Sequence, residues 1–203
     1  MNNRFPFKPL ALAFLFLMTP KGVSAKPVTW FDGIHTVSLS VPRGVDPVVD
    51  VASHMFKGDI AQVTGIAPKL TDLAQQATIR LWQLDRLSRR QQRELRDMGV
   101  PVEKLQTLTD GFHIRVHHGQ IVVVGTNGRG TAYGLLELSR QAGVSPWVWW
   151  GDVTPMKQEI LTVPANYTTF QSPSVEYRGI FLNDEDWSLQ PWSWKTFEPS
   201  NIK

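Results

Sequence analysis

Residues 111–130 read GFHIRVHHGQIVVVGTNGRG. Gly111–His117 alternates in polarity and Gln120–Gly125 is almost wholly apolar, and the pair His118-Gly119 separates them. Two strand-forming runs joined by two turn residues predict a β-hairpin. The apolar second strand is expected to be central in its sheet, because a central strand is covered on both faces.

The surrounding sequence alternates strands and helices. Strands are predicted at Thr36–Val41, Ala77–Trp82 and Glu159–Val163, and helices at Pro47–Val63, Ser88–Met98 and Thr131–Ala142. Because the hairpin adds an antiparallel pair, this pattern predicts an α/β domain with a mixed sheet and flanking helices over residues 26–163. The Pro/Thr/Ser-rich residues 164–174 are predicted to be a linker, and Tyr177–Leu182 a further strand.

The glycine-rich segment Gly125–Gly130 follows a strand and opens a helix. That context is typical of dinucleotide-binding turns, but the spacing is GxxGxG rather than GxGxxG. The alternative is a tight strand-to-helix turn, with glycines at unusual φ and at close packing contacts. The spacing favours this second interpretation.

Residues 1–25 have the features of a secretory signal peptide. A basic start is followed by a short apolar run and by Val23-Ser24-Ala25, which resembles a cleavage site. The chain has 21 basic and 18 acidic residues, and residues 1–25 hold three of the basic ones and no acid. The remainder is therefore balanced at 18 of each, which removes the electrostatic argument for a nucleic-acid partner.

Export agrees with the rest of the composition. No later segment is long and apolar enough to cross a membrane, and the chain contains no cysteine. A disulfide-free exported domain suggests a periplasmic or cell-surface location. The five histidines include no His-x3-His helical pair; His113 and His117 share a strand face, but no metal site and no cofactor are predicted.

The segment Asn183-Asp184-Glu185-Asp186-Trp187 follows the last predicted strand. Glycosidases use one carboxylic acid to protonate the leaving oxygen and one carboxylate to activate water or to attack. Neighbouring residues rarely supply both at the required separation, so a partner carboxylate is expected on another strand. Tryptophan faces stack on sugar rings, which favours a ligand role for Trp187. The alternative is a solvated acidic turn capped by Trp187. A second cluster, Trp147, Trp149 and Trp150, fits sugar stacking or domain packing.

Two stretches resemble glycoside hydrolase family 115, the xylan α-1,2-glucuronidases. They are Arg129–Val153, which hexosaminidase-like and other glucuronidase families share more loosely, and the more specific Tyr177–Trp192. The resemblance implies that the α/β domain precedes a catalytic (β/α)8 barrel, whose first strand lies in residues 175–203. It further implies removal of glucuronic acid or 4-O-methylglucuronic acid from glucuronoxylan, with inversion and without a metal. The Asn-Asp-Glu match lies at the end of that first strand. We therefore assign Asp184 and Glu185 as catalytic, and Asn183, Asp186 and Trp187 as substrate-binding.

The length sets a limit on this interpretation. A (β/α)8 barrel needs about 200 residues or more, and few follow residue 174. The sequence is therefore expected to hold a truncated barrel and to be inactive by itself. Two alternatives stay open: a non-catalytic carbohydrate-binding or domain-docking module, and the N-terminal domain of a hexosaminidase-like glycosidase.

Overall fold

A computed structural model describes residues 26–148, 151–181, 189, 191, 193 and 194. The predicted signal peptide, Trp149, Trp150 and the predicted site Asn183–Trp187 lie outside these described residues.

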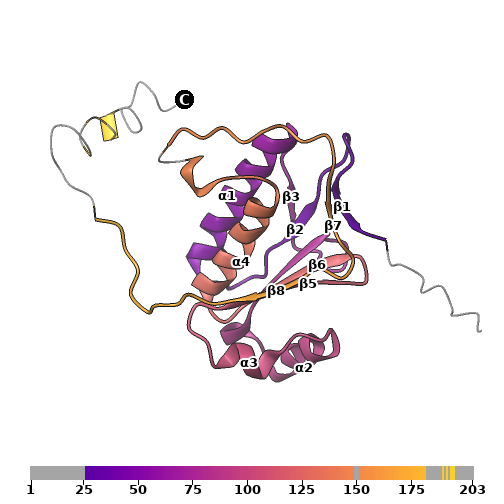
Figure 1. Ribbon diagram of the computed structural model, residues 1–203. Coiled ribbons are helices and arrows are strands. Elements are labelled where there is room, and N and C mark those ends of the chain that lie inside the picture. The colour runs from indigo at the N-terminus through magenta and orange to yellow at the C-terminus, as the bar shows by residue number, and fades with distance from the viewer. Residues whose placement is uncertain (1–25, 149–150, 182–188, 190, 192, 195–203) are drawn as a thin grey trace, which may run out of the picture.

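A six-stranded sheet forms the centre of the molecule (Figure 1). Its order is β3 (Lys69–Thr71), β2 (Ser38–Ser40), β4 (Ile79–Gln83), β6 (Gln120–Gly125), β5 (Phe112–His117) and β8 (Thr168–Gln171). The first four strands are parallel, and β5 is antiparallel to both of its neighbours. The predicted mixed α/β sheet is therefore confirmed, with β6 in a central position.

The hairpin is confirmed in its register as well as in its existence. His117 pairs with Gln120, so His118 and Gly119 form a two-residue loop with φ values of 46° and 77°. Positive φ at both loop residues is the geometry that matches the twist of the flanking strands. Gly119 adopts it without steric cost.

Helices cover both faces of the sheet. α1 (Pro47–Thr64) and α4 (Gly128–Gln141) pack against each other and against one face, where Phe56, Leu135 and Ile121 are fully buried. α2 (Arg89–Asp97) and α3 (Val102–Gln106) cover the other face, on Trp82, Val122 and Val124. Neighbouring residues of β6 thus belong to opposite cores, as the alternation of a strand requires.

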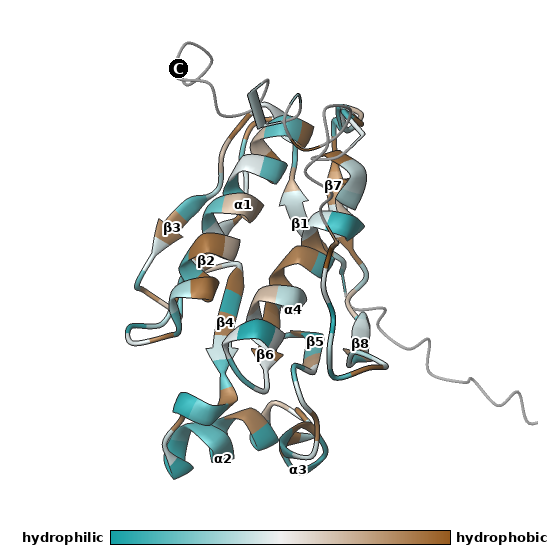
Figure 2. Ribbon diagram, turned by 90° about the vertical axis from the view of Figure 1, so that its left-hand side faces the viewer, coloured by the Kyte–Doolittle hydropathy of each residue, from teal (hydrophilic) through white to brown (hydrophobic). Residues whose placement is uncertain are grey.

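The helix ends follow their capping signals. α1 starts at Pro47 after the extended Asp46 and ends at Gly65, whose φ is 85°. α2 starts with a capping box between Ser88 and Gln91, and its polar surface stands out in Figure 2. The helical core stripe predicted for α1 is buried, which is why the sequence located this helix within one residue.

Residues predicted as linker contribute a strand, which corrects the predicted boundary. β8 pairs with β5, and Phe170 packs on the core formed with α2 and α3. The free edge of β5 needs hydrogen-bond partners, and Thr and Phe suit an edge strand despite the flanking prolines. A second, two-stranded sheet of β1 (Val28–Phe31) and β7 (Leu161–Val163) was only half predicted. Short 3-10 turns, η1 (Leu84–Arg86) and η2 (Pro146–Val148), complete the described elements.

Candidate functional site

The structure describes the approach to the predicted site rather than the site itself. Residues 175–181 lead from β8 towards Asn183, which lies outside the described residues. No strand is assigned to residues 175–181, although the sequence predicted one from Tyr177. All seven residues are exposed, and Tyr177 and Phe181 expose 88% and 89% of their surface. This approach segment, residues 175–181, is therefore not held by apolar burial.

A buried carboxylate meets the approach segment at the start of β5. Asp110 has φ of 54°, a left-handed conformation that aspartate tolerates better than most residues, and its side chain is completely buried. It accepts hydrogen bonds from Asn127 Nδ2 at 2.9 Å, from Arg129 Nε at 3.1 Å and from Arg178 Nη2. Two of these donors start α4, and the third comes from 68 residues further along the chain.

The pKa of Asp110 reflects this crowded set of donors. Burial raises it, but the hydrogen bonds from Asn127 and Arg178, together with the charges of Arg129 and Arg178, outweigh burial and lower the pKa below its usual value. Asp110 is therefore ionised at neutral pH despite being buried. It is a satisfied anion, which suits anchoring better than proton transfer.

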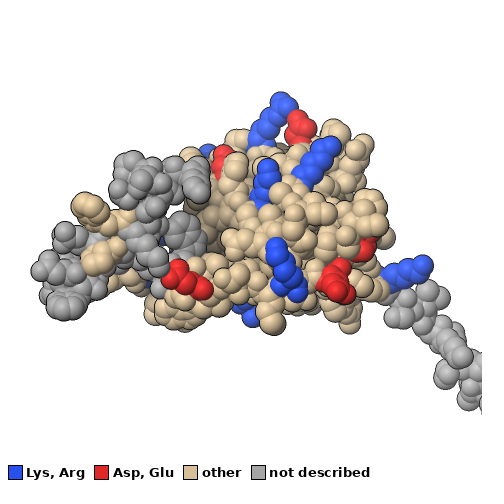
Figure 3. Space-filling view, turned by 90° about the horizontal axis from the view of Figure 1, so that it is seen from above, with Lys and Arg blue, Asp and Glu red and all other residues tan. Residues whose placement is uncertain are grey.

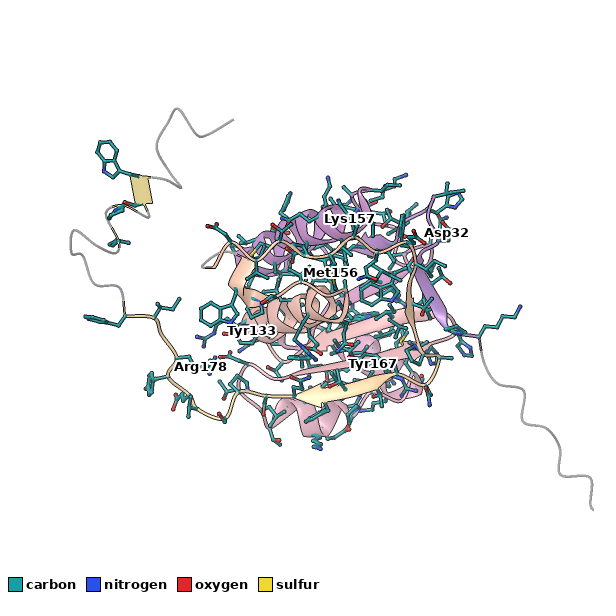
Figure 4. All side chains as sticks on the ribbon, turned by 45° about the horizontal axis from the view of Figure 1, so that its top comes forward. Asp32, Tyr133, Met156, Lys157, Tyr167 and Arg178 are labelled. Carbon is teal, nitrogen blue, oxygen red and sulfur yellow. The ribbon has the colours of Figure 1, made fainter. Side chains whose placement is uncertain are left out.

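Arg178 links this anion to the approach segment itself. Its Nη1 donates to the carbonyl oxygens of Val175 at 2.6 Å and Glu176 at 3.0 Å. Its Nη2 reaches Asp110 and, at 3.4 Å, the Tyr133 hydroxyl, and its guanidinium carbon lies 5.7 Å from the centre of the Tyr133 ring. The hydrogen bonds to Tyr133 and Asp110 raise the pKa of Arg178. Figure 4 shows Arg178 and Tyr133 at the same end of the domain.

Glycines bring the donors into place. An added Cβ on Gly130 would lie 2.3 Å from the Gly111 carbonyl oxygen, and one on Gly125 would lie 2.0 Å from the Thr131 nitrogen. These contacts bring the start of α4 against the turn that carries Asp110. Close packing is thus the role of the glycine segment, as the favoured interpretation predicted. Unusual φ is not, because none of Gly125, Gly128 and Gly130 has a positive φ.

Sequence patterns did not indicate the contact that Arg178 makes with Asp110 and Tyr133. Tyr133, Arg129 and Arg178 fell within the two stretches that carried the family resemblance, but no role followed for them. Asp110 was not singled out, because a single aspartate before a strand resembles an ordinary turn residue. Its only local signal is the following glycine, and nothing in the sequence pairs it with a residue 68 positions away.

Other exposed aromatic side chains that could stack on a sugar lie away from the approach segment or beyond it. Trp147 in η2 is 63% exposed, and Trp194 is 66% exposed. Beside η2, a cavity of about 430 Å³ opens between α1 and α4; its apolar lining includes Met55, Leu136, Val144, Pro146 and Val148. Asp59 also lines it, and burial raises the pKa of that carboxyl. Glu137 and Arg140, which form an ion pair, also line it, so the cavity could take a small apolar group beside charged side chains.

The surroundings of His113 in β5 indicate a packing role rather than a ligand-binding one. Burial, followed by the charge of Arg115, lowers the pKa of His113 to about 4, and its ring lies 6.0 Å from that of Phe170. Among the described residues, no three His, Asp or Glu side chains are grouped to hold a metal ion, and no helix is long and apolar enough to cross a bilayer. Basic and acidic side chains are interspersed on the face in Figure 3.

Comparisons with known proteins place the chain in a family. Residues 170–203 match the family model described as Glycosyl hydrolase family 115, and this match includes the approach segment and Asn183–Trp187. A solved structure titled as a family GH115 4-O-methyl-alpha-glucuronidase, BtGH115A, with specificity for decorated arabinogalactans, is similar with a TM-score of 0.70. The two chains are 38% identical, and the alignment covers 82% of this chain and 21% of that one.

A search of curated proteins found no match. The present chain spans about a fifth of the length of the solved relative. The family match near its C-terminal end and the structural similarity over most of its length agree with each other and with the resemblance found in the sequence. The chain belongs to glycoside hydrolase family 115.

Proposed function

We propose that this protein is an exported glycoside hydrolase that removes glucuronic acid or 4-O-methylglucuronic acid from polysaccharide side chains. The observation that carries the proposal is the family match over residues 170–203, which contains Asn183–Trp187. The solved relative supports it, because that protein is described as a 4-O-methyl-alpha-glucuronidase.

Asp184 and Glu185 are the proposed catalytic carboxylates of this segment. One carboxyl group of a glycosidase must donate a proton to the leaving oxygen, and a second must activate water or attack the sugar. Asp184 and Glu185 are adjacent, so one of them would work with a carboxylate from another part of the barrel. Asn183, Asp186 and Trp187 would contact the sugar through hydrogen bonds and stacking.

The polysaccharide that carries the uronic acid is the next feature of the substrate to assign. The sequence resemblance implies glucuronoxylan, whereas the name of the solved relative specifies decorated arabinogalactans. Both polysaccharides can carry a terminal uronic acid, which is the group that a hydrolase of this kind must recognise. We propose that the uronic acid is the shared determinant and retain glucuronoxylan or its oligosaccharides as the expected substrate.

The test uses the protein at its natural length, with glucuronoxylan and a decorated arabinogalactan as parallel substrates. Release of uronic acid is expected from at least one of them, and Asp184→Asn or Glu185→Gln should lower turnover by about 100-fold or more. Glu176→Gln is the matched control, since it removes an exposed carboxylate of the approach segment without touching the proposed pair. Unchanged turnover in both site variants would refute the assignment.

Two further outcomes sharpen the mechanism. If the reaction inverts, proton NMR should detect the β-anomer of the uronic acid first; an initial α-anomer would show retention. We expect residues 1–203 alone to release no uronic acid, because neighbouring residues rarely supply both carboxyl groups at the separation that glycosidases use and the partner is proposed to lie elsewhere in the barrel. Measurable turnover by residues 1–203 would contradict that expectation.

A binding module is the second candidate, because Trp147 is 63% exposed beside an apolar cavity. Isothermal titration of residues 1–203 with aldouronic acids separates the two proposals. Micromolar binding that Trp147→Ala abolishes would favour the module. No heat of binding is expected if the uronic acid is recognised within the barrel.

A further inference from the structure

The approach segment has an unusual means of attachment. Every residue from Val175 to Phe181 is exposed, so burial of apolar surface contributes little to its position. The structure gives the segment a firm connection through one side chain, Arg178, which bonds to Asp110 and Tyr133 of the domain. Among the described residues, Arg178 is therefore the side chain that joins this segment to the α/β domain.

The buried carboxylate of Asp110 does not need Arg178 in order to stay paired. Asp110 keeps hydrogen bonds from Asn127 and Arg129, both at the start of α4, when Arg178 is absent. Arg129 is 60% exposed and can share its charge with water. The buried carboxylate therefore stays paired and the core stays folded, so the specific contribution of Arg178 is to the segment.

The guanidinium group is needed for its shape as well as its charge. It donates in two directions at once, to Asp110 and Tyr133 on one side and to the carbonyl oxygens of Val175 and Glu176 on the other. A lysine ammonium could replace the ion pair but could not fix both the domain and the backbone turn with a planar fork. The contacts thus set the direction in which the chain leaves the domain.

We infer that Arg178 is a positioning residue, which docks residues 175–181 on the α/β domain and so sets the direction in which the chain continues beyond β8. The inference rests on the proposed function for its catalytic meaning. Its structural part, the docking of residues 175–181 through Arg178, can be tested without any substrate.

The structural test uses spin labels, which the absence of native cysteines makes specific. Gly179→Cys places one label in open space on the approach segment, and Arg93→Cys places the other on the exposed side of α2. Pulsed electron paramagnetic resonance then gives the distribution of distances between them. The doubly labelled protein that retains Arg178 should give a narrow distribution of distances.

Arg178→Gln should broaden it strongly. Freed from the anchor, position 179 is about eight residues beyond β8, and a flexible chain of that length has a reach of about 15 Å. Arg178→Lys should lie between the two. Arg43→Gln, which removes the exposed ion pair with Asp72, is the matched control and should change nothing. A distribution as narrow in Arg178→Gln as in wild type would overturn the docking role.

Asp110→Asn provides a second variant that acts from the other side of the contact. It keeps an acceptor for Asn127 and loses the charge that Arg178 pairs with, so it should also broaden the distribution. Circular dichroism establishes that each variant is folded before labelling. If Asp110→Asn and Arg178→Gln both leave the segment fixed, other contacts hold it and the inference is wrong.

The catalytic part is tested in the protein at its natural length. Misplaced catalytic groups lower turnover steeply, so Arg178→Gln should reduce kcat by about 100-fold while KM changes much less. Arg178→Lys should recover part of kcat. If Arg178→Gln broadened the distance distribution but left kcat unchanged, the role of Arg178 in positioning the catalytic groups would be refuted. If wild type released no uronic acid, the proposed function would fail while the docking result stood.

Discussion

The α/β core and the approach segment are held by opposite kinds of interaction. The core buries complete rows of Val, Ile and Leu between the sheet and helices on both faces. Residues 175–181 are exposed throughout and depend on a charged side chain that reaches the buried Asp110. Apolar burial spreads stability over many residues, whereas a polar anchor concentrates positioning in a few.

This difference separates folding from function in the molecule. Substitutions in the core should change the free energy of unfolding, and substitutions at the anchor should change where the segment points. The family match begins at residue 170, so the anchored part is the one that leads into the proposed catalytic segment.

The largest loss of stability is expected from Phe56→Ala. Phe56 is fully buried between α1 and the sheet, and truncating such a side chain costs about 3–5 kcal/mol. Val51 lies on the same helix with 58% exposure, so Val51→Ala should cost less than about 1 kcal/mol. Urea denaturation measures both. Equal losses in the two variants would show that the core is not where the structure places it.

Gly125→Ala should be nearly as damaging. The new methyl group would lie 2.0 Å from the Thr131 backbone nitrogen, so α4 must move off β6, at a cost of about 2–3 kcal/mol. Gly58→Ala on α1 is the control, because nothing lies within 4 Å of its added Cβ. In a helix that change should stabilise by about 0.5–1 kcal/mol. A neutral Gly125→Ala would refute the close approach.

The buried His113 should make stability depend on pH, with a loss of unfolding free energy similar to or smaller than that of Gly125→Ala. Its pKa is about 4 in the folded protein against 6.5 in the unfolded chain, so only the unfolded state gains this proton as pH falls between these values. Stability should therefore be full above pH 6.5 and should decline towards pH 4, by up to about 3 kcal/mol. His113→Phe should flatten this part of the profile, and His54→Phe, on the exposed surface of α1, should not. An unchanged slope in His113→Phe would show that His113 is not responsible.

The smallest effect on stability is expected at Arg178. Arg178→Gln should leave the urea midpoint unchanged, because Asp110 keeps two donors and the approach segment buries no apolar side chain. A midpoint as low as that of Gly125→Ala would mean that Arg178 belongs to the core.

Sequence patterns predicted the core well because its signals are local. The apolar spacing in α1, the His118-Gly119 turn and the Ser88 cap each act within a few residues. β8 was missed because the reason for it, the open edge of β5, lies elsewhere in the chain. The contact between Asp110 and Arg178 was missed for the same reason. The predicted site residues 183–187 keep their assignment as a proposal.

Limited digestion with chymotrypsin tests the division between core and anchored segment most directly. Tyr177 and Phe181 are both exposed, so access to them depends on the freedom of the backbone around Arg178 rather than on burial. Mass spectrometry should show faster cleavage after these two residues in Arg178→Gln than in wild type, whereas cleavage after the exposed Trp147 should proceed at the same rate in both. Equal cleavage rates at Tyr177 and Phe181 in the two proteins, or an equal acceleration after Trp147, would contradict the division.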